Sequence, residues 1–134
     1  LRNDVKNNDY KRSENMGYTK FGKIVRKEMI DHDENLLSIA QLLGVTTSFV
    51  SAVLTGGKSV PDNWVDELSK HYGLKGSKYD ELYDAYCEDK KNVRIDVENV
   101  PLTQKKLALQ FQRKLPELDE DEIQSIFDIL KEDK

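Results

Sequence analysis

The chain has 134 residues, of which 21 are Lys or Arg and 25 are Asp or Glu, so its formal net charge at pH 7 is −4. This length fits one domain, or one small domain with an appendage. The acidic balance counts against a nucleic-acid-binding protein, which is usually basic, unless the positive charge is concentrated in one part of the chain. The single cysteine excludes an internal disulfide and suits a reducing cytoplasm, and no apolar run approaches the roughly 20 residues that cross a bilayer.

Charge is unevenly distributed along the chain. Residues 1–30 carry eight basic and four acidic side chains, residues 31–74 carry two and six, and residues 75–134 carry 11 and 15. Positive charge is therefore concentrated on the N-terminal side. Residues 1–17 are polar and lack apolar periodicity, which predicts a flexible basic segment. Met16 leaves a second interpretation open, in which the residues before it belong to an upstream extension.

The first amphipathic helix is predicted between Thr19 and about Ile30. Thr19 is a suitable N-cap because its hydroxyl can accept a hydrogen bond from an amide of the first turn. Apolar residues recur at helical spacing on one face, and basic residues occupy the other. The apolar stripe consists of Phe21, Ile24, Val25 and Met29, and the basic face consists of Lys20, Lys23, Arg26 and Lys27. We expect the basic face to be solvated, as charged helix faces usually are.

Two short helices joined by a tight turn are predicted in residues 36–57, LLSIAQLLGVTTSFVSAVLTGG. Asn35 is the expected N-cap of the first helix, and Thr46 or Thr47 that of the second. Gly44 stands where the first helix must end with a positive φ. Apolar and small residues at helical spacing face inward in both helices, which is the pattern of a helix-turn-helix. They are Ile39, Ala40, Leu43, Val45, Val50 and Val53.

A further helix is expected after the loop formed by residues 56–60. Pro61 occupies the first-turn position that favours proline, and Gly73 provides the stop. Four side chains at helical spacing are expected to enter the core, and these are Trp64, Val65, Leu68 and Tyr72.

The next helix is predicted from Ser77 to about Lys90, and it carries three tyrosines and a leucine on one stripe. These residues are Tyr79, Leu82, Tyr83 and Tyr86. Aromatic residues are enriched at protein interfaces, so the tyrosines either line a dimer interface or pack back on their own domain. Cys87 is expected to be a small, partly buried apolar residue rather than a reactive thiol.

Residues 91–101 alternate apolar and polar side chains, which indicates an extended linker or a short strand. Residues 102–134 form a predicted helical hairpin, in which Thr103 opens the first helix, Pro116 breaks it and Asp119 caps the second. The apolar faces consist of Leu107, Ala108, Phe111 and Leu115 in one helix, and Ile123, Ile126, Phe127 and Leu130 in the other. Such faces need a partner, either within the chain or outside it.

The helix-turn-helix and its flanks resemble the DNA-binding domain of the lambda repressor/Cro family, the Xre class of bacterial and phage regulators. The resemblance covers residues 19–74. It is carried by Ala40, Gly44 and Val45 around the turn, by Val50, Val53 and Gly56–Gly57, and by the Pro-Asp-x-Trp-x-x-x-Leu segment that begins at Pro61. It implies a lambda-repressor-like five-helix domain, which we place over residues 18–90. Together with the linker 91–101 and the helical hairpin 102–134 read from the residues themselves, it gives an all-α protein.

The outward face of the second helix of the motif carries small and hydroxylated side chains, which a DNA major groove admits. The expected DNA-binding residues are Thr46, Thr47, Ser48, Ser51 and Ala52 on this face, Thr55 and Lys58 toward phosphates, and, as the resemblance implies, Lys20 and Arg26 on the first helix. This face lacks Arg, Lys, Asn and Gln, the residues that make bidentate base contacts. We therefore expect modest specificity per half-site, with dimer spacing and DNA shape supplying the rest. The segment 1–17 is alternatively a basic arm that contacts DNA.

No catalytic pattern is present in the sequence. It contains no Gly-rich phosphate loop, no zinc-protease motif and no Ser or Cys nucleophile with a matching His and Asp. His32, His71 and Cys87 do not have the spacing of a metal-ligand set. We expect no enzymatic activity, no cofactor and no metal.

The sequence predicts a cytoplasmic transcriptional regulator, in the first instance a repressor, that binds double-stranded DNA as a homodimer on a pseudo-palindromic operator and does not bind membranes. The alternative is an antitoxin-like or antirepressor-like module whose acidic residues 102–134 bind a second protein. Deletion of residues 101–134 distinguishes the two, because it abolishes dimerisation in the first case and only partner binding in the second.

Overall fold

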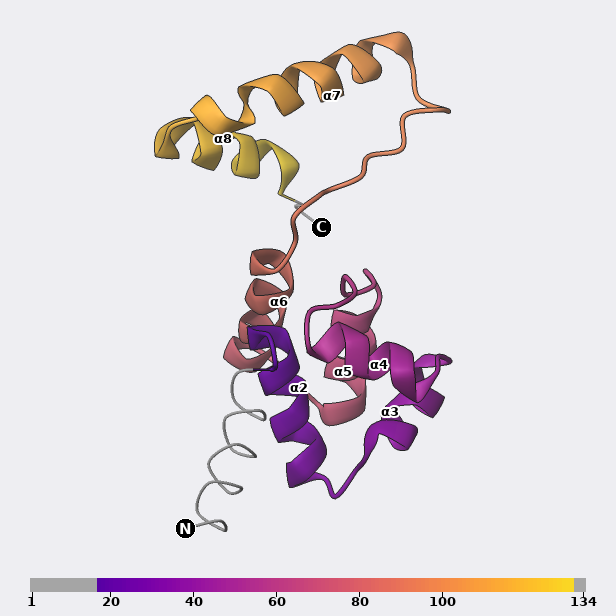
Figure 1. Cartoon of the computed structure of the whole chain (residues 1–134). Coiled ribbons are helices and arrows are strands. Elements are labelled where there is room, and N and C mark those ends of the chain that lie inside the picture. The colour runs from indigo at the N-terminus through magenta and orange to yellow at the C-terminus, as the bar shows by residue number, and fades with distance from the viewer. Residues whose placement is uncertain (1–16, 132–134) are drawn as a thin grey trace, which may run out of the picture. The chain divides into compact units, whose positions relative to one another are not determined.

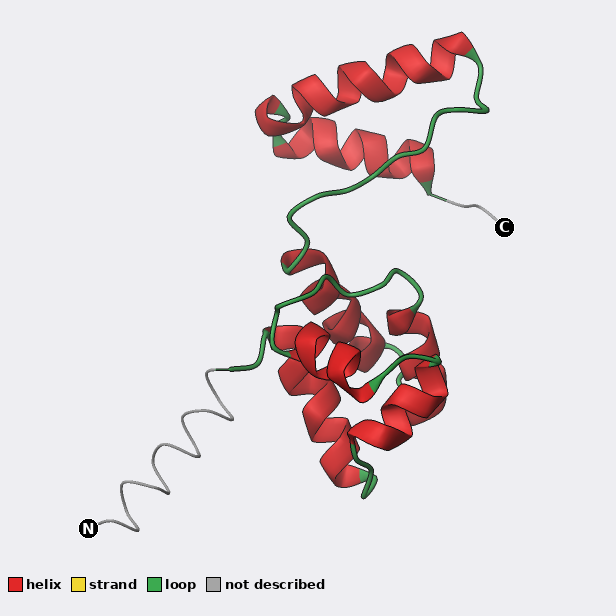
Figure 2. Cartoon of the chain, turned by 45° about the vertical axis from the view of Figure 1, so that its right-hand side comes forward, coloured by secondary structure: helices red, strands yellow, loops and turns green. Residues whose placement is uncertain are grey.

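A computed structural model describes residues 17–131, and within this range the chain is helical with no strand (Figures 1 and 2). The prediction of an all-α protein is thereby confirmed. The elements are α2 (Lys20–Asp31), α3 (Leu36–Leu43), α4 (Thr47–Leu54), α5 (Trp64–Tyr72), α6 (Ser77–Glu88), α7 (Leu102–Lys114), the short 3-10 helix η1 (Leu115–Glu117) and α8 (Glu120–Leu130). They belong to two compact units, the first ending at Asn92 and the second beginning at Val93. The predicted segment 1–17, apart from Gly17, lies outside the described residues.

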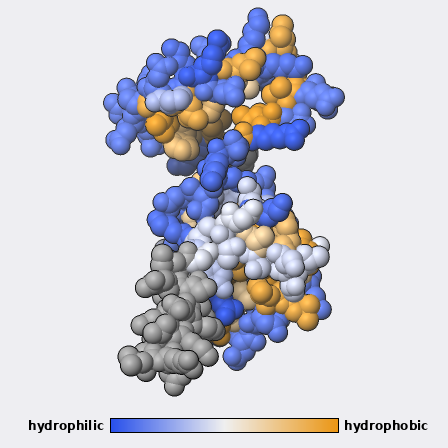
Figure 3. Space-filling view, viewed as in Figure 1, coloured by the Kyte–Doolittle hydropathy of each residue, from blue (hydrophilic) through white to orange (hydrophobic). Residues whose placement is uncertain are grey.

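The second unit consists of an extended segment followed by the hairpin of α7 and α8, which run alongside each other in both views (Figures 1 and 2). α8 begins with a capping box, in which Asp119 accepts the amide of Glu122 at 2.8 Å and Glu122 accepts the amide of Asp119 at 3.0 Å. None of the described side chains of this unit is buried. Apolar patches accordingly lie on its surface (Figure 3).

The alternating segment that precedes α7 is not a strand. Val93, Ile95 and Val97 instead lie along α7 and line a groove with it. A single extended segment forms a stable strand only when another strand pairs with it, and here its neighbour is a helix. The strand interpretation of residues 91–101 is therefore wrong, and the extended linker is what the structure shows.

Side-chain caps fix where three helices of the first unit begin. Thr19 accepts from the amide of Gly22 at 3.0 Å, Asn35 from that of Ser38 at 3.0 Å, and Thr46 from that of Phe49 at 3.1 Å. Each bond satisfies one of the amides that a helix leaves unpaired in its first turn. The caps expected at Thr19 and Asn35 are confirmed, and of the two threonines considered for α4, Thr46 is the cap.

Glycines end two of these helices in the left-handed conformation. Gly44 has a φ of 69° after α3, and Gly73 has a φ of 67° after α5. The amide of Val45 then donates to the carbonyl of Ala40 at 2.9 Å, which closes the end of α3 as the chain reverses. The axis turns by 102° between α3 and α4, within the range of a helix-turn-helix.

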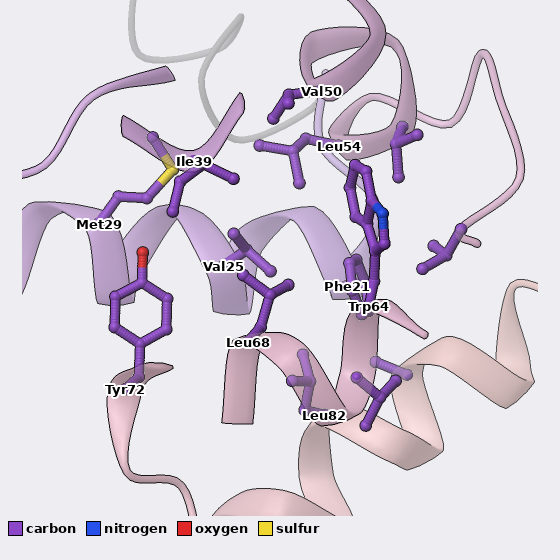
Figure 4. Close-up of a cluster of buried hydrophobic side chains, with 14 of the residues drawn as sticks. Phe21, Val25, Met29, Ile39, Val50, Leu54, Trp64, Leu68, Tyr72 and Leu82 are labelled. Atoms are coloured by element: carbon purple, nitrogen blue, oxygen red, sulfur yellow. The ribbon is translucent and has the colours of Figure 1, made fainter. Parts of the chain in front are cut away.

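The core of the first unit lies where α2, α3, α4, α5 and α6 meet (Figure 4). Its largest fully buried side chains come from all five helices and include Trp64, Phe21, Met29, Ile39, Leu54, Leu68 and Leu82. Phe49, which is half-buried, meets the ring of Trp64 edge-on, with 5.9 Å between ring centroids. Burial of each such side chain stabilises the fold by about 1.5–3 kcal/mol, so this core holds the helix-turn-helix in place. The prediction that Trp64 and Tyr72 are core residues is confirmed.

The backbones of α2 and α4 touch directly at Gly22. The amide of Thr19 donates to the carbonyl oxygen of Leu54 at 3.1 Å, and the Thr19 hydroxyl lies 3.4 Å from the same oxygen. A Cβ on Gly22 would lie 2.0 Å from that oxygen. Leu54 ends α4, so its carbonyl lacks a helical partner. The partial positive start of α2 thus meets the partial negative end of α4.

α5 begins at Trp64, and the prediction that Pro61 opens it is wrong. The carbonyl of Pro61 accepts from the amide of Trp64 at 3.1 Å, which closes a turn ahead of the helix. Val60 is buried, so the loop is already held on the core before the helix can start. Pro61 therefore shapes the loop, and the N-cap residue Asn63 makes no side-chain capping bond.

Two of the three tyrosines of α6 pack back on their own unit. Tyr79 and Tyr86 pack against the core of their own unit, whereas Tyr83 is exposed and stacks on Tyr79 with 6.3 Å between ring centroids. Cys87 is exposed, so the expectation of a partly buried cysteine is wrong. The reason is helical geometry, because Cys87 follows the buried Ala85 by two residues and therefore lies about 200° around the helix from it.

We expect Gly22→Ala to lower the free energy of unfolding by about 1–3 kcal/mol, because the added methyl group must displace the backbone of α4. In an ordinary helix interior the same substitution stabilises by up to ~1 kcal/mol, so the sign is diagnostic. The control is Gly57→Ala, whose Cβ would lie 3.5 Å from its nearest neighbour and should change stability by less than about 0.5 kcal/mol. Urea unfolding of both variants measures the difference, and a Gly22→Ala variant as stable as the wild type would contradict the close contact.

Candidate nucleic-acid interface

The outward face of α4 is formed by small polar side chains. Thr47, Ser48 and Ser51 are exposed, and Ala52 is half-buried at its edge. On the other side of the helix, Val50, Val53 and Leu54 are buried in the core. α4 therefore presents a narrow, hydroxyl-bearing surface on a rigidly packed helix.

The hydroxyl groups of this face differ in what they can still bind. Thr46 accepts a bond from the amide of Phe49 and keeps its own O–H to donate. Thr55 donates its O–H to the carbonyl of Ser51 at 2.8 Å, so that proton is already used. The hydroxyls of Thr47, Ser48 and Ser51 make no hydrogen bond within the described part of the chain, and they remain available as both donors and acceptors.

The loop after α4 folds back onto the end of the helix. The amides of Gly57 and Lys58 both donate to the carbonyl of Ala52, at 2.7 and 3.1 Å, and Gly56 has a φ of 87°. The Lys58 side chain is exposed. The fold thus places Lys58 directly beyond the hydroxyl face of α4.

A cavity of about 380 Å³ separates this loop from the C-terminal end of α6. Lys58 and Ser59 line it on the loop side, and Lys90 and Lys91 line it on the other. Lys58 was expected here from the sequence. Lys90 and Lys91 were not, because nothing in the sequence places residues 90 and 91 beside the loop. Asp89 also lines the cavity, so three lysines and one carboxylate meet next to α4.

The loop is tethered to α6 through Asp62. The Tyr86 hydroxyl donates to the Asp62 carboxylate, Lys90 donates to the same oxygen at 3.2 Å, and the Lys90 ammonium lies 5.0 Å from the centre of the Tyr86 ring. The hydrogen bond from Tyr86 and the charge of Lys90 lower the pKa of Asp62 below its ordinary value. Burial and the bond to Asp62 raise the pKa of Tyr86 to about 12. Lys90 is therefore partly neutralised, whereas Lys58 forms no ion pair among the described residues.

The basic face of α2 meets acidic side chains of α6. Lys20 forms an ion pair with Glu88 at 2.9 Å, and a hollow beside this pair is lined by Lys20, Lys23, Glu81, Asp84 and Glu88. Lys20 is exposed, as expected of a solvated face, and it also forms an ion pair that the sequence did not predict. Both partners are largely exposed, so the pair contributes only about 0–1 kcal/mol and a phosphate can compete for Lys20.

The expected site residues on α2 lie at different distances from α4. Lys20 follows Thr19, whose amide bonds to the last residue of α4, so Lys20 lies close to the end of that helix. Arg26 is half-buried and lies six residues further along α2, about 9 Å along the helix axis. The structure brings Lys20 near the loop after α4 and leaves Arg26 at a more remote position.

No protein-family model, curated protein or solved structure matches the chain.

In the range 17–131, no three His, Cys, Asp or Glu side chains are grouped in a way that could hold a metal ion. No single helix of this range is long and apolar enough to cross a bilayer, and only the bent pair of α3 and α4 passes the same test jointly.

We expect a pH titration by nuclear magnetic resonance to give an Asp62 pKa below 3.8, its ordinary value. Because folding lowers this pKa, the tether stabilises the fold above pH 3.8 and loses that contribution as the pH falls through the pKa of the folded state. Tyr86→Phe should move the Asp62 pKa back toward 3.8. Tyr83→Phe removes a hydroxyl from the neighbouring exposed ring and should leave it unchanged, and an Asp62 pKa insensitive to Tyr86→Phe would contradict the tether.

Proposed function

We propose that the chain is a sequence-specific DNA-binding transcriptional regulator that works as a dimer, with α3 and α4 as a helix-turn-helix and α4 as the recognition helix. The observation that carries the proposal is the face of α4, where Thr47, Ser48 and Ser51 point away from a closed core with unused hydroxyls. The 102° turn between α3 and α4 and the order of α2 to α5 support a lambda-repressor-like arrangement.

The recognition helix would contact bases with short side chains. Ser48 and Ser51 hydroxyls can donate to or accept from base edges, and the Ala52 methyl fits against the methyl group of thymine. Each contact is weaker than a bidentate pair from Arg or Asn. Specific binding by this face therefore requires two half-sites and a favourable DNA shape, which is why the proposal includes a dimer.

Phosphate contacts in the proposed complex would be few. Lys58 lies beyond α4 and Lys91 across the neighbouring cavity, while Lys20 and Lys90 each already pair with a carboxylate. The salt dependence of binding scales with the number of phosphates that are neutralised. The proposal thus entails a shallower salt dependence than that of strongly basic DNA-binding proteins.

The function is tested by selecting bound sites from random duplex DNA with the full chain at low salt. The proposal expects an enriched and roughly palindromic site, and it expects the Ser48→Ala/Ser51→Ala variant to lose the enrichment. An unenriched pool after repeated rounds would contradict the regulator.

On the selected duplex, we expect Ser48→Glu/Ser51→Glu to weaken binding by at least about tenfold, because two carboxylates would face the DNA and two polar contacts would be lost. Ser77→Glu introduces the same side chain at the start of α6, where an acid suits the helix dipole, and it should leave affinity within about twofold. Fluorescence anisotropy with labelled duplex measures both. Ser77→Glu adds one negative charge where the double variant adds two. A loss of binding free energy in Ser77→Glu that is about half that of the double variant, or larger, would therefore show an effect of overall charge and would contradict the assigned face.

A further inference from the structure

The second unit does not bury its apolar side chains by itself. Large apolar residues of α7 and α8 are strongly exposed, among them Leu107 at 67%, Phe127 at 61%, Ile129 at 81% and Leu130 at 70%. The unit spans only residues 93–134, a size at which a chain segment usually needs a partner, a metal or a disulfide to stay folded. The exposed apolar surface of this unit thus indicates a site at which a partner binds.

Charge is segregated between the two helices of this unit. α7 carries Lys105, Lys106, Arg113 and Lys114 and no acidic residue, whereas α8 carries Glu120, Asp121, Glu122 and Asp128 and no basic residue. In the part of the chain that the structure describes, no ion pair joins α7 to α8. The positive charges of α7 and the negative charges of α8 can therefore each form ion pairs with a surface of opposite sign.

A second copy of the same hairpin supplies both opposite surfaces at once. A two-fold axis places the same patch of each copy in contact with the other, so basic α7 can meet acidic α8 twice. A uniformly acidic or basic partner would satisfy one helix and repel the other. The four positive and four negative side chains of α7 and α8 balance each other, which favours self-association over either.

We propose that the hairpin of α7 and α8 is a homodimerisation surface, in which α7 of each copy packs antiparallel to α8 of the other. Antiparallel packing places Arg113 and Lys114 beside the acidic start of the partner's α8, and Lys105 beside the partner's Asp128. The result is a four-helix bundle closed by apolar side chains of both copies. This inference stands whether or not α4 binds DNA.

A groove beside α7 can accept apolar side chains of the partner's α8. It has a volume of about 390 Å³ and is lined by Val93, Ile95, Val97, Ala108, Phe111 and Leu115, with Lys105 at its edge. Phe127 and Leu130 of the partner subunit are apolar side chains one turn apart that can fill it. Asp128 lies between these two positions in the sequence, so filling the groove brings the partner's Asp128 toward Lys105.

The test is the mass of the full chain by sedimentation equilibrium. The wild type should sediment at twice its 15.5 kDa. One variant replaces Lys105, Lys106, Arg113 and Lys114 by Glu and makes both helices acidic, and another replaces Glu120, Asp121 and Asp128 by Lys and makes α8 basic. Each variant alone should dimerise at least about 100-fold more weakly, because like charges then face each other, and an equimolar mixture should restore the dimer.

The groove is tested separately by Leu130→Asp, with Ser125→Asp as the control on the same helix. Leu130→Asp should weaken the dimer by at least about tenfold, and Ser125→Asp should not. Circular dichroism shows whether the first unit remains folded in each variant. The proposal is overturned if the wild type is monomeric, or if the dimer persists in both charge variants and in Leu130→Asp. It is also overturned if the equimolar mixture stays monomeric, or if the hairpin binds only a different protein.

Discussion

The position of α4 depends on one contact between two helix ends. The carbonyl of Leu54, the last residue of α4, accepts the amide of Thr19 directly ahead of α2, and Gly22 leaves no side chain to hold the backbones apart. The contact satisfies groups that both helices would otherwise leave unpaired, and it aligns opposite ends of two helix dipoles. Because α4 is only eight residues long, it cannot be stable alone. Its orientation is therefore set by α2 and by the core beneath it.

The loop after α4 is held in place by the C-terminal end of α6, because Tyr86 and Lys90 both donate hydrogen bonds to Asp62. The same helix places Glu88 against Lys20. α6 thus determines both where the loop lies and how much positive charge remains beside it. The hydroxyl face of α4 stays uncovered by this unit, which is the physical basis of the proposal that it meets DNA.

Local features of this fold were readable from the sequence, and long-range ones were not. Thr19, Asn35, Gly44, Gly73 and Asp119 each act within a few residues of their own position, so helix starts and ends follow from residue type. The pairs Lys20–Glu88 and Tyr86–Asp62 join residues 68 and 24 positions apart, and no periodicity encodes them. The prediction that α5 begins at Pro61 was wrong for a related reason, since the burial of Val60 in the tertiary structure decides where α5 begins. The hydroxyl face of the candidate site follows from helical spacing, whereas Lys90 and Lys91 enter it only through tertiary packing.

Amide hydrogen exchange of the full chain, with and without a duplex selected from random DNA, tests the central claim most directly. If α4 is the recognition helix, DNA should slow exchange of the amides of residues 47–52 and of the loop 55–59. Slower exchange confined to α7 and α8, or unchanged exchange in α4 at saturating duplex, would contradict the account.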